Sequence, residues 1–204
     1  AIVLTDAGAT RAAVEEAVRE IGSRAGPDDM FVFFYSGHGA QVPRSGPQPS
    51  DPDAMDETLE FYDTRITDDE FSALLSEIAP GVTLVALDAC FSGGFSKDVV
   101  SVPGRMGLFS SEEDVVSSVA AKFRAGGYLA HFIADGVGRQ LADLNGDRTT
   151  SALELSQYLH NRYREDVESS SGGDYVRTGG PQLGYQHLVV DRGSIASSEV
   201  LFRR

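Results

Sequence analysis

Two apolar runs, each followed at once by a glycine-rich loop, most constrain how this chain can fold. The first run, Met30-Phe-Val-Phe-Phe-Tyr, leads into Ser36-Gly-His-Gly. The second, Val82-Thr-Leu-Val-Ala-Leu-Asp-Ala-Cys, leads into Phe91-Ser-Gly-Gly. Short continuous apolar runs bounded by turn residues are typical of strands buried on both faces, as in a parallel sheet.

Segments with helical features alternate with these strands. We expect, in chain order, a strand at 1–4, a helix that Thr10 caps and that runs to Ile21, a strand at 30–35, a helix at 69–78, a strand at 82–87, a short strand at 106–110, and helices at 127–141 and 152–167. This alternation predicts an α/β fold with a mostly parallel central sheet and helices on both faces. A chain of 204 residues suits one domain, residues 1–204, with a substantial core.

Cys90 and His38 follow the two best-defined strands. Because the carboxyl ends of parallel strands meet at one edge of a sheet, we expect the two side chains to lie side by side. An imidazole next to a thiol converts it into a useful nucleophile. Alternatively, Cys90 is a small buried hydrophobic residue and His38 an ordinary loop residue. The two glycine-rich loops favour the catalytic interpretation, and the other histidines, His131, His160 and His187, lack such settings.

The segments Tyr35-Ser-Gly-His-Gly-Ala-Gln and Leu87-Asp-Ala-Cys-Phe-Ser-Gly resemble the caspase-like cysteine peptidases of family C14, and most of all the metacaspases and bacterial orthocaspases. The resemblance spans most of the chain and is strongest from Thr10 to Gly94. It implies a caspase-like three-layer sandwich in which Cys90 forms an acyl-enzyme and His38 manages protons. It also implies that the backbone N–H groups of Gly39 and Cys90 hold the oxyanion.

Asp88 stands where the caspase signature has glutamine. In this family the residue two before the cysteine lies in the pocket for the side chain that precedes the cleaved bond. The resemblance therefore implies cleavage after Arg, less often Lys, since a guanidinium pairs with a carboxylate through two hydrogen bonds. Alternatively, Asp88 caps the turn after its strand. Self-processing would follow from the same preference, with Arg105, Arg124, Arg139, Arg148 and Arg177 as candidate positions.

The resemblance also implies that residues 1–4 correspond to the family's second strand, so that the family's first strand and helix have no counterpart here. Either a processed amino-terminal fragment binds non-covalently or the sequence is incomplete. In metacaspases that segment is also a source of a second acidic pocket residue. The resemblance therefore does not determine the complete set of residues that form the specificity pocket.

Acidic residues near Ser50-Asp-Pro-Asp-Ala-Met-Asp-Glu and Thr67-Asp-Asp-Glu resemble metacaspase motifs, and several metacaspases need calcium. Calcium prefers about six to eight oxygen ligands, so several loops must converge. The candidate ligands are Asp53, Asp56, Asp68, Asp69 and Asp98. Thr67 and Glu70 also match a capping box, in which the acids of the first turn favour the helix dipole. The two interpretations are compatible.

A third acidic segment, which begins at Asp143, resembles an EF-hand loop. Oxygen-bearing side chains occupy loop positions 1, 3, 5, 9 and 12, as Asp143, Asn145, Asp147, Ser151 and Glu154. Arg148 occupies the sixth position, where the motif requires glycine. An ordinary turn before a helix explains much of the same pattern.

Composition restricts the remaining function classes. The net charge of −14, from 31 acidic and 17 basic side chains, argues against nucleic acid or an anionic membrane as a partner. One cysteine cannot form a disulfide framework, and no secretory signal is evident, so we expect a cytoplasmic protein whose partners are peptide or protein substrates. Segments 95–105 and 168–182 are expected to be loops. Two competing functions are a catalytically silent caspase-like scaffold and another cysteine hydrolase.

Overall fold

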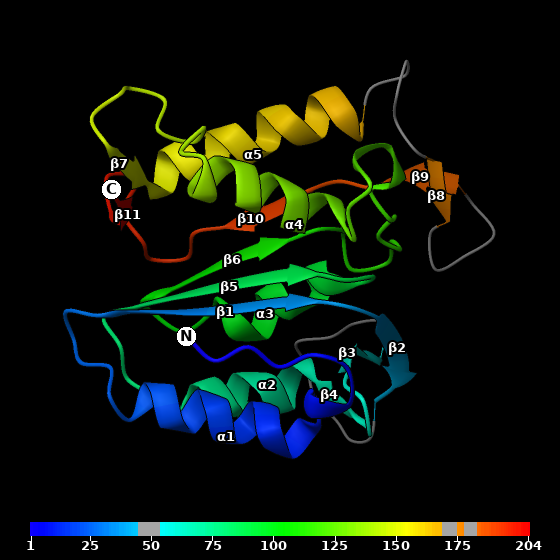
Figure 1. The fold of residues 1–204 in the computed structure, drawn as a ribbon. Helices are drawn as coiled ribbons and strands as arrows, with labels where there is room; N and C mark the ends of the chain where they lie inside the picture. Colours follow the sequence, from blue (N-terminus) through cyan, green and yellow to red (C-terminus); the bar gives the residue numbers. More distant parts are fainter. Residues whose placement is uncertain (45–53, 169–174, 178–182) are drawn as a thin grey trace.

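A four-stranded sheet forms the centre of the computed structural model, which describes residues 1–44, 54–168, 175–177 and 183–204 (Figure 1). Its strands, in spatial order, are β1 (Met30–Ser36), β5 (Val82–Asp88), β6 (Arg105–Phe109) and β10 (Val189–Asp191). The first three are parallel and β10 is antiparallel to β6. The mostly parallel sheet predicted from the apolar runs is therefore confirmed.

Helices cover both faces of this sheet, which gives the three layers seen in Figure 1. One layer contains α1 (Arg11–Gly22), α2 (Asp68–Leu75) and α3 (Phe95–Val99), and the other contains α4 (Tyr128–Ile133) and α5 (Ala152–Asp166). Side chains of β5 alternate between the two resulting cores, with Leu84 in the core of α4 and α5 and Val85 in the core of α1 and α2. Both faces of β5 are therefore buried.

Smaller elements surround this centre. They are η1 (Asp6–Gly8), β2 (Gly39–Pro43), β3 (Met55–Glu60), β4 (Arg65–Thr67), η2 (Ser92–Gly94), η3 (Ala121–Phe123), the π-helical turn η4 (Ala134–Gly138), β7 (Thr149–Ser151), β8 (Tyr175–Arg177), β9 (Leu183–Tyr185) and β11 (Val200–Arg203). Strands β2, β3 and β4 form one antiparallel sheet, and β7 with β11 and β8 with β9 form two more.

Three helices begin as local sequence predicts. The Thr10 hydroxyl accepts a hydrogen bond from the Ala13 N–H at 3.3 Å. At α2 the expected capping box is present, because Thr67 Oγ1 accepts from the Glu70 N–H and Glu70 Oε2 accepts from the Thr67 N–H. Ser151 begins α5 with the same motif. Side-chain caps of this kind each contribute about 1 kcal/mol.

Three expectations from the sequence are wrong. Residues 1–4 do not form a strand, because they pair with none of the described strands and Ile2 and Val3 are exposed. The helix expected at 127–141 is shorter, because α4 ends at Ile133. The π-helical turn η4 follows it and contains Gly136 and Gly138, which destabilise an α-helix. Segment 95–105 is not a loop throughout, because it includes α3 and buries Phe95 and Val99. Most of segment 168–182 lies outside the described residues.

Candidate active site

Backbone contacts bring the two glycine-rich loops together. Ser36 and Asp88 are register partners at the ends of β1 and β5, and the Gly37 N–H donates to the Asp88 carbonyl at 3.2 Å. A Cβ atom on Gly39 would lie 2.1 Å from the carbonyl oxygen of Cys90. Only glycine permits this approach. The His38 loop is thus packed directly against Cys90.

His38 is anchored by its backbone and has an exposed side chain. Its carbonyl oxygen accepts from the Glu60 N–H at 3.0 Å and lies 2.9 Å from the Tyr35 hydroxyl, which also lies 2.7 Å from the Glu60 carbonyl. Burial raises the pKa of Tyr35 to about 12, so this hydroxyl stays a neutral donor. A Cβ atom on Gly37 would lie 2.5 Å from that hydroxyl. The loop is therefore fixed while the imidazole faces solvent.

Cys90 is partly buried beneath the segment that follows β6. Its Sγ accepts from the Ser117 N–H at 3.3 Å and lies 3.7 Å from the Ser117 carbonyl oxygen. The next residue, Phe91, has a left-handed backbone with φ of 59°, and its N–H donates to the Val115 carbonyl at 2.9 Å. Such non-glycine residues are uncommon and occur often at functional sites.

Asp88 is buried, with 4% of its surface exposed, and it caps a helix. Its Oδ2 accepts from the Ala130 N–H at 2.7 Å, and it forms hydrogen bonds with the Ser110 and Ser117 hydroxyls. Burial raises the pKa of Asp88 despite these bonds. Gly127 occupies the N-cap position of α4 without a side chain, so Asp88 provides the capping oxygen from another strand. Asp88 therefore acts as a cap, but it caps the start of α4 and not the turn after β5.

Gln186 connects the segment over the cysteine to the core. Its Nε2 donates to the Ser110 carbonyl at 2.6 Å and to Ser117 Oγ at 2.8 Å, and its Oε1 accepts from the Ser118 N–H at 2.8 Å. Gln186 is fully buried. Sequence reasoning missed it together with Ser110 and Ser117, because a single glutamine far along the chain carries no recognisable motif.

The first acidic cluster surrounds Asp68. Its Oδ1 accepts from the Asp69 N–H at 3.0 Å, whereas its buried Oδ2 has no hydrogen-bond partner. Burial raises the pKa of Asp68 to about 8, with further contributions from the nearby Glu57, Asp98 and Asp56. Four of the five predicted calcium ligands are thus described in this region, and the fifth, Asp53, lies outside the described residues.

Arg44 separates two of these carboxylates. Its Nε lies 2.7 Å from Asp56 Oδ1 and its Nη2 lies 3.6 Å from Asp69 Oδ2. Across residues 1–44, 54–168 and 186–204, no group of three or more Asp, Glu, His or Cys side chains converges closely enough to hold a metal ion. Glu57, which sequence reasoning missed, belongs to the same cluster, and its Oε1 accepts from Gln41 Nε2 at 3.0 Å. These carboxylates therefore do not form a calcium site in the described arrangement, in which Arg44 contacts Asp56 and Asp69.

Donors of the EF-hand-like loop itself occupy most of its candidate oxygens, although the buried Glu154 Oε1 has no hydrogen-bond partner. The Asp143 carboxylate accepts from the N–H groups of Gly146, Asp147 and Arg148 at 2.8 to 3.1 Å. Arg148 has φ of 70°, which is the left-handed conformation that the motif's glycine would supply. The hydrogen bond from the Thr149 hydroxyl is the main cause of a lowered pKa at Asp147. Asn145 Oδ1 accepts from the Asp147 N–H, and Glu154 Oε2 accepts from Ser151. The geometry is that of an ordinary turn before α5.

The three layers, with Cys90 and the His38 loop at the carboxyl edge of parallel strands, are consistent with a caspase-like fold. Residues 4–98 match the family model described as the metacaspase, peptidase C14 domain. Metacaspase-8 of Arabidopsis thaliana is 36% identical over 73 residues, which are 35% of this chain and 19% of that protein. Metacaspase-1 of Schizosaccharomyces pombe is 33% identical over 105 residues, 46% of this chain and 24% of that protein. Residues 4–98 of this chain are thus similar to the metacaspases of peptidase family C14, and the matched relatives cover between a third and a half of the chain.

A solved structure shares this fold over nearly the whole chain. The crystal structure of a Geobacter sulfurreducens protein superimposes with a TM-score of 0.62 at 20% identity and covers 98% of this chain and 83% of that one. The matches to the curated metacaspases span only about a fifth to a quarter of those proteins. Within the described part of the chain, no helix is both long and apolar enough to cross a bilayer.

Proposed function

We propose that this protein is a cysteine endopeptidase that cleaves after Arg, less often Lys, through Cys90 and His38. The observation that carries the proposal is the contact between the backbone of Gly39 and the carbonyl of Cys90, which packs the His38 loop against the candidate nucleophile. The similarity of residues 4–98 to the metacaspase, peptidase C14 domain supports peptide hydrolysis as the class of reaction.

The proposed reaction has two halves. The Cys90 thiolate attacks the carbonyl carbon of the substrate, and the C–N bond breaks as the amine leaves with a proton from imidazolium His38. Neutral His38 then takes a proton from water, which attacks the thioester and releases the acid and the Cys90 thiolate, so that the thiolate and imidazolium are restored. The Gly39 and Cys90 N–H groups would hold the oxyanion, and the Cys90 N–H donates to no acceptor in the described residues. Losing one such donor typically costs about 100- to 1,000-fold in turnover.

Asp88 is the proposed selector of the basic side chain. Its carboxylate lies beside Gly127, where a Cβ atom would approach the Oδ atoms to between 2.1 and 2.3 Å. The absent side chain leaves room for the carboxylate at the start of α4, and because Asp88 is only 4% exposed, a guanidinium would reach it only after neighbouring groups move. A cation there would also oppose the burial that raises the pKa of Asp88. Among the candidate self-processing positions, Arg124, Arg139 and Arg148 are exposed and Arg105 is buried.

Calcium binding by Asp56, Asp68, Asp69 and Asp98 is a separate part of the proposal, and no catalytic step depends on it. The partnerless Oδ2 of Asp68 supports it, while Arg44 would have to leave Asp56 and Asp69. Calcium needs ionised carboxylates, so stabilisation by added calcium should increase between pH 6 and pH 8 and vanish in Asp68→Asn. Calcium at the Asp143 loop would instead survive that substitution.

An amino-terminal strand is a proposed partner of the sheet edge. Among the described strands, β1 pairs with β5 only, and its Val32 and Phe34 side chains are exposed to 43% and 47%. A parallel sheet is usually covered on both faces, so an additional strand and helix supplied non-covalently would complete this edge.

A cytoplasmic location is a further part of the proposal, since the protein has a single, free cysteine.

The testing experiment measures cleavage of matched fluorogenic peptides that end in Arg, Lys or Asp, with and without calcium, and Cys90→Ala is the blank. Arg cleavage that the substitution abolishes supports the proposal, whereas preferred cleavage after Asp refutes the role of Asp88. A peptide electrophile that carries Arg distinguishes the alternatives. A silent scaffold would not be labelled at Cys90, and a different cysteine hydrolase would not depend on the Arg.

A further inference from the structure

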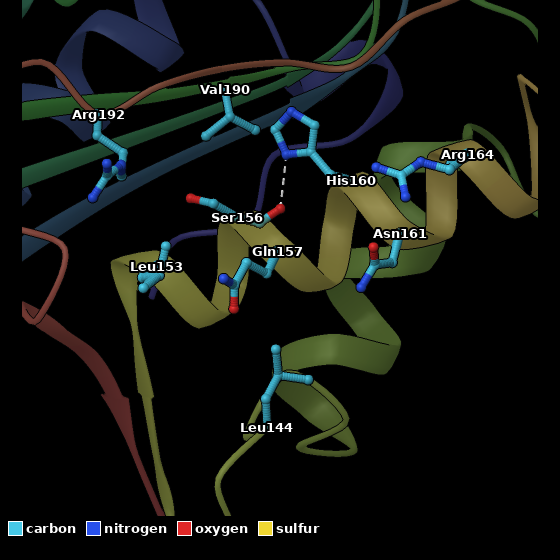
Figure 2. A pocket seen from close by; sticks show the side chains of 9 residues that line it. All are labelled: Leu144, Leu153, Ser156, Gln157, His160, Asn161, Arg164, Val190 and Arg192. Carbon is cyan, nitrogen blue, oxygen red and sulfur yellow. Dashed lines mark hydrogen bonds between the residues drawn. The ribbon is translucent and has the colours of Figure 1, made fainter.

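A cavity of about 470 Å³ lies on the outer side of α5, next to β10 (Figure 2). It opens to solvent, and none of its lining residues belongs to the candidate active site. Helix α5 contributes Leu153, Gln157, His160 and Arg164 from one side, and Val190 and Arg192 line it at β10. We call this cavity the α5–β10 groove.

The groove is basic in a protein whose net charge is −14. Its lining includes two arginines and one histidine but no aspartate or glutamate. Arg164 and Arg192 have no carboxylate partner within the described residues, although Arg162 of the same helix pairs with Asp166 at 2.7 Å. Arg192 instead donates a hydrogen bond to the Ser197 hydroxyl. Two unneutralised guanidinium groups therefore face one cavity.

The remaining lining favours a peptide over a small anion. His160 lies beside Val190 in Figure 2, held by a 2.8 Å hydrogen bond between its Nδ1 and the Ser156 carbonyl. Leu153 is 40% exposed at the same groove, and the amide of Gln157 lies next to it. Apolar side chains contribute nothing to phosphate binding, whereas a peptide buries them and pairs its backbone with side-chain amides.

We propose that the α5–β10 groove docks an acidic segment of a partner protein, whose Asp or Glu side chains pair with Arg164 and Arg192. Charge complementarity is the main argument, because a guanidinium binds a carboxylate through two parallel hydrogen bonds. The surface is separate from Cys90, so the inference holds whether or not the chain is a peptidase. In a peptidase the groove would act as a secondary binding surface for a substrate or a regulator.

Fluorescence anisotropy with a fluorescein-labelled peptide of the repeating sequence Glu-Leu-Gly tests this inference. We expect wild type to bind it and to bind the matched Lys-Leu-Gly peptide far more weakly, with the difference decreasing at high salt. The variant with Arg164→Gln and Arg192→Gln should bind the acidic peptide about tenfold more weakly, since two exposed charge pairs are lost. The control with Arg24→Gln and Arg139→Gln removes the same charge from exposed positions outside the groove and should bind like wild type.

Three outcomes would overturn the inference. They are no binding of the acidic peptide, equal weakening in the control variant, and full displacement of the peptide by inorganic phosphate at equal concentration. The last would identify a small-anion site. If the double variant unfolds, as judged by circular dichroism, the two single variants provide the same test, with about threefold weakening expected from each.

Discussion

Asp68 makes the stability of this fold depend on pH in a direction opposite to that of most carboxylates. Its pKa is raised to about 8, chiefly by burial. In the unfolded chain the same group titrates near pH 3.9. Between these values the folded protein binds a proton that the unfolded chain has released. The free energy of unfolding therefore decreases as pH rises through this window, and the decrease ends above about pH 8.

The magnitude follows from the same two values. Each pH unit within the window costs about 1.4 kcal/mol, so at pH 7 this carboxyl reduces the free energy of unfolding by about 4 kcal/mol relative to acid conditions. Asn is neutral at every pH and similar in shape to protonated Asp. The stability of Asp68→Asn minus that of wild type should therefore increase by about 1.4 kcal/mol per unit between pH 5 and pH 7.

Urea unfolding of both proteins at closely spaced pH values measures this difference, and other titrating groups cancel in it. Glu16→Gln is the matched control, because Glu16 is exposed on α1 and the substitution removes the same charge. Its difference from wild type should stay within about 0.5 kcal/mol. A difference between Asp68→Asn and wild type that does not change from pH 5 to pH 7 would refute the assignment of a buried, protonated carboxyl.

Three further substitutions test the candidate active site. Gly127→Ala should lower the free energy of unfolding in urea by about 1–3 kcal/mol, because its Cβ would overlap Asp88. The control Gly138→Ala, whose Cβ would have no atom within 4 Å, should change the free energy of unfolding by less than about 1 kcal/mol. Equal effects of the two substitutions would contradict this geometry. Asp88→Asn should lower kcat/KM for Arg peptides by about 10- to 100-fold while keeping an oxygen for the Ala130 N–H, and unchanged cleavage would remove Asp88 as the selector. Gln186→Ala should increase the rate of Cys90 alkylation by iodoacetamide at least about threefold, since the two hydrogen bonds with which Gln186 holds Ser117 and Ser118 over the sulfur are lost. An unchanged rate would mean that this segment does not shield the thiol.

Sequence patterns predicted the parts of this fold that depend on neighbours along the chain. The strands at Met30 and Val82 and the caps at Thr10 and Thr67 are local, and each is present. The meeting of the His38 and Cys90 loops followed from the rule that parallel strands end at one edge. The expected strand at residues 1–4 failed because a strand forms only with a partner, and periodicity does not reveal whether a partner exists.

The long-range polar contacts could not be predicted from the sequence. No strand was expected from Asp56 to Glu60, yet these residues belong to the central strand β3 of a small sheet. Its charge is tolerated there because Arg44 reaches Asp56 across the β2–β3 pair. The cap that Asp88 provides for α4 joins residues 42 positions apart. No local propensity specifies such a contact, and the absence of a capping side chain at Gly127 gave only an indirect indication.

The shared use of Asp88 has a consequence for attempts to redesign this protein. One carboxylate holds the start of α4 and, in the proposed mechanism, selects the residue before the cleaved bond. Replacing it with an apolar residue to admit other side chains would leave the Ala130 N–H without an acceptor. The same replacement would remove the carboxylate that occupies the place of a side chain at position 127. A serine introduced at position 127 could then cap α4 itself. Altered selectivity is therefore most accessible through paired changes at positions 88 and 127, and libraries that vary one position at a time would miss it.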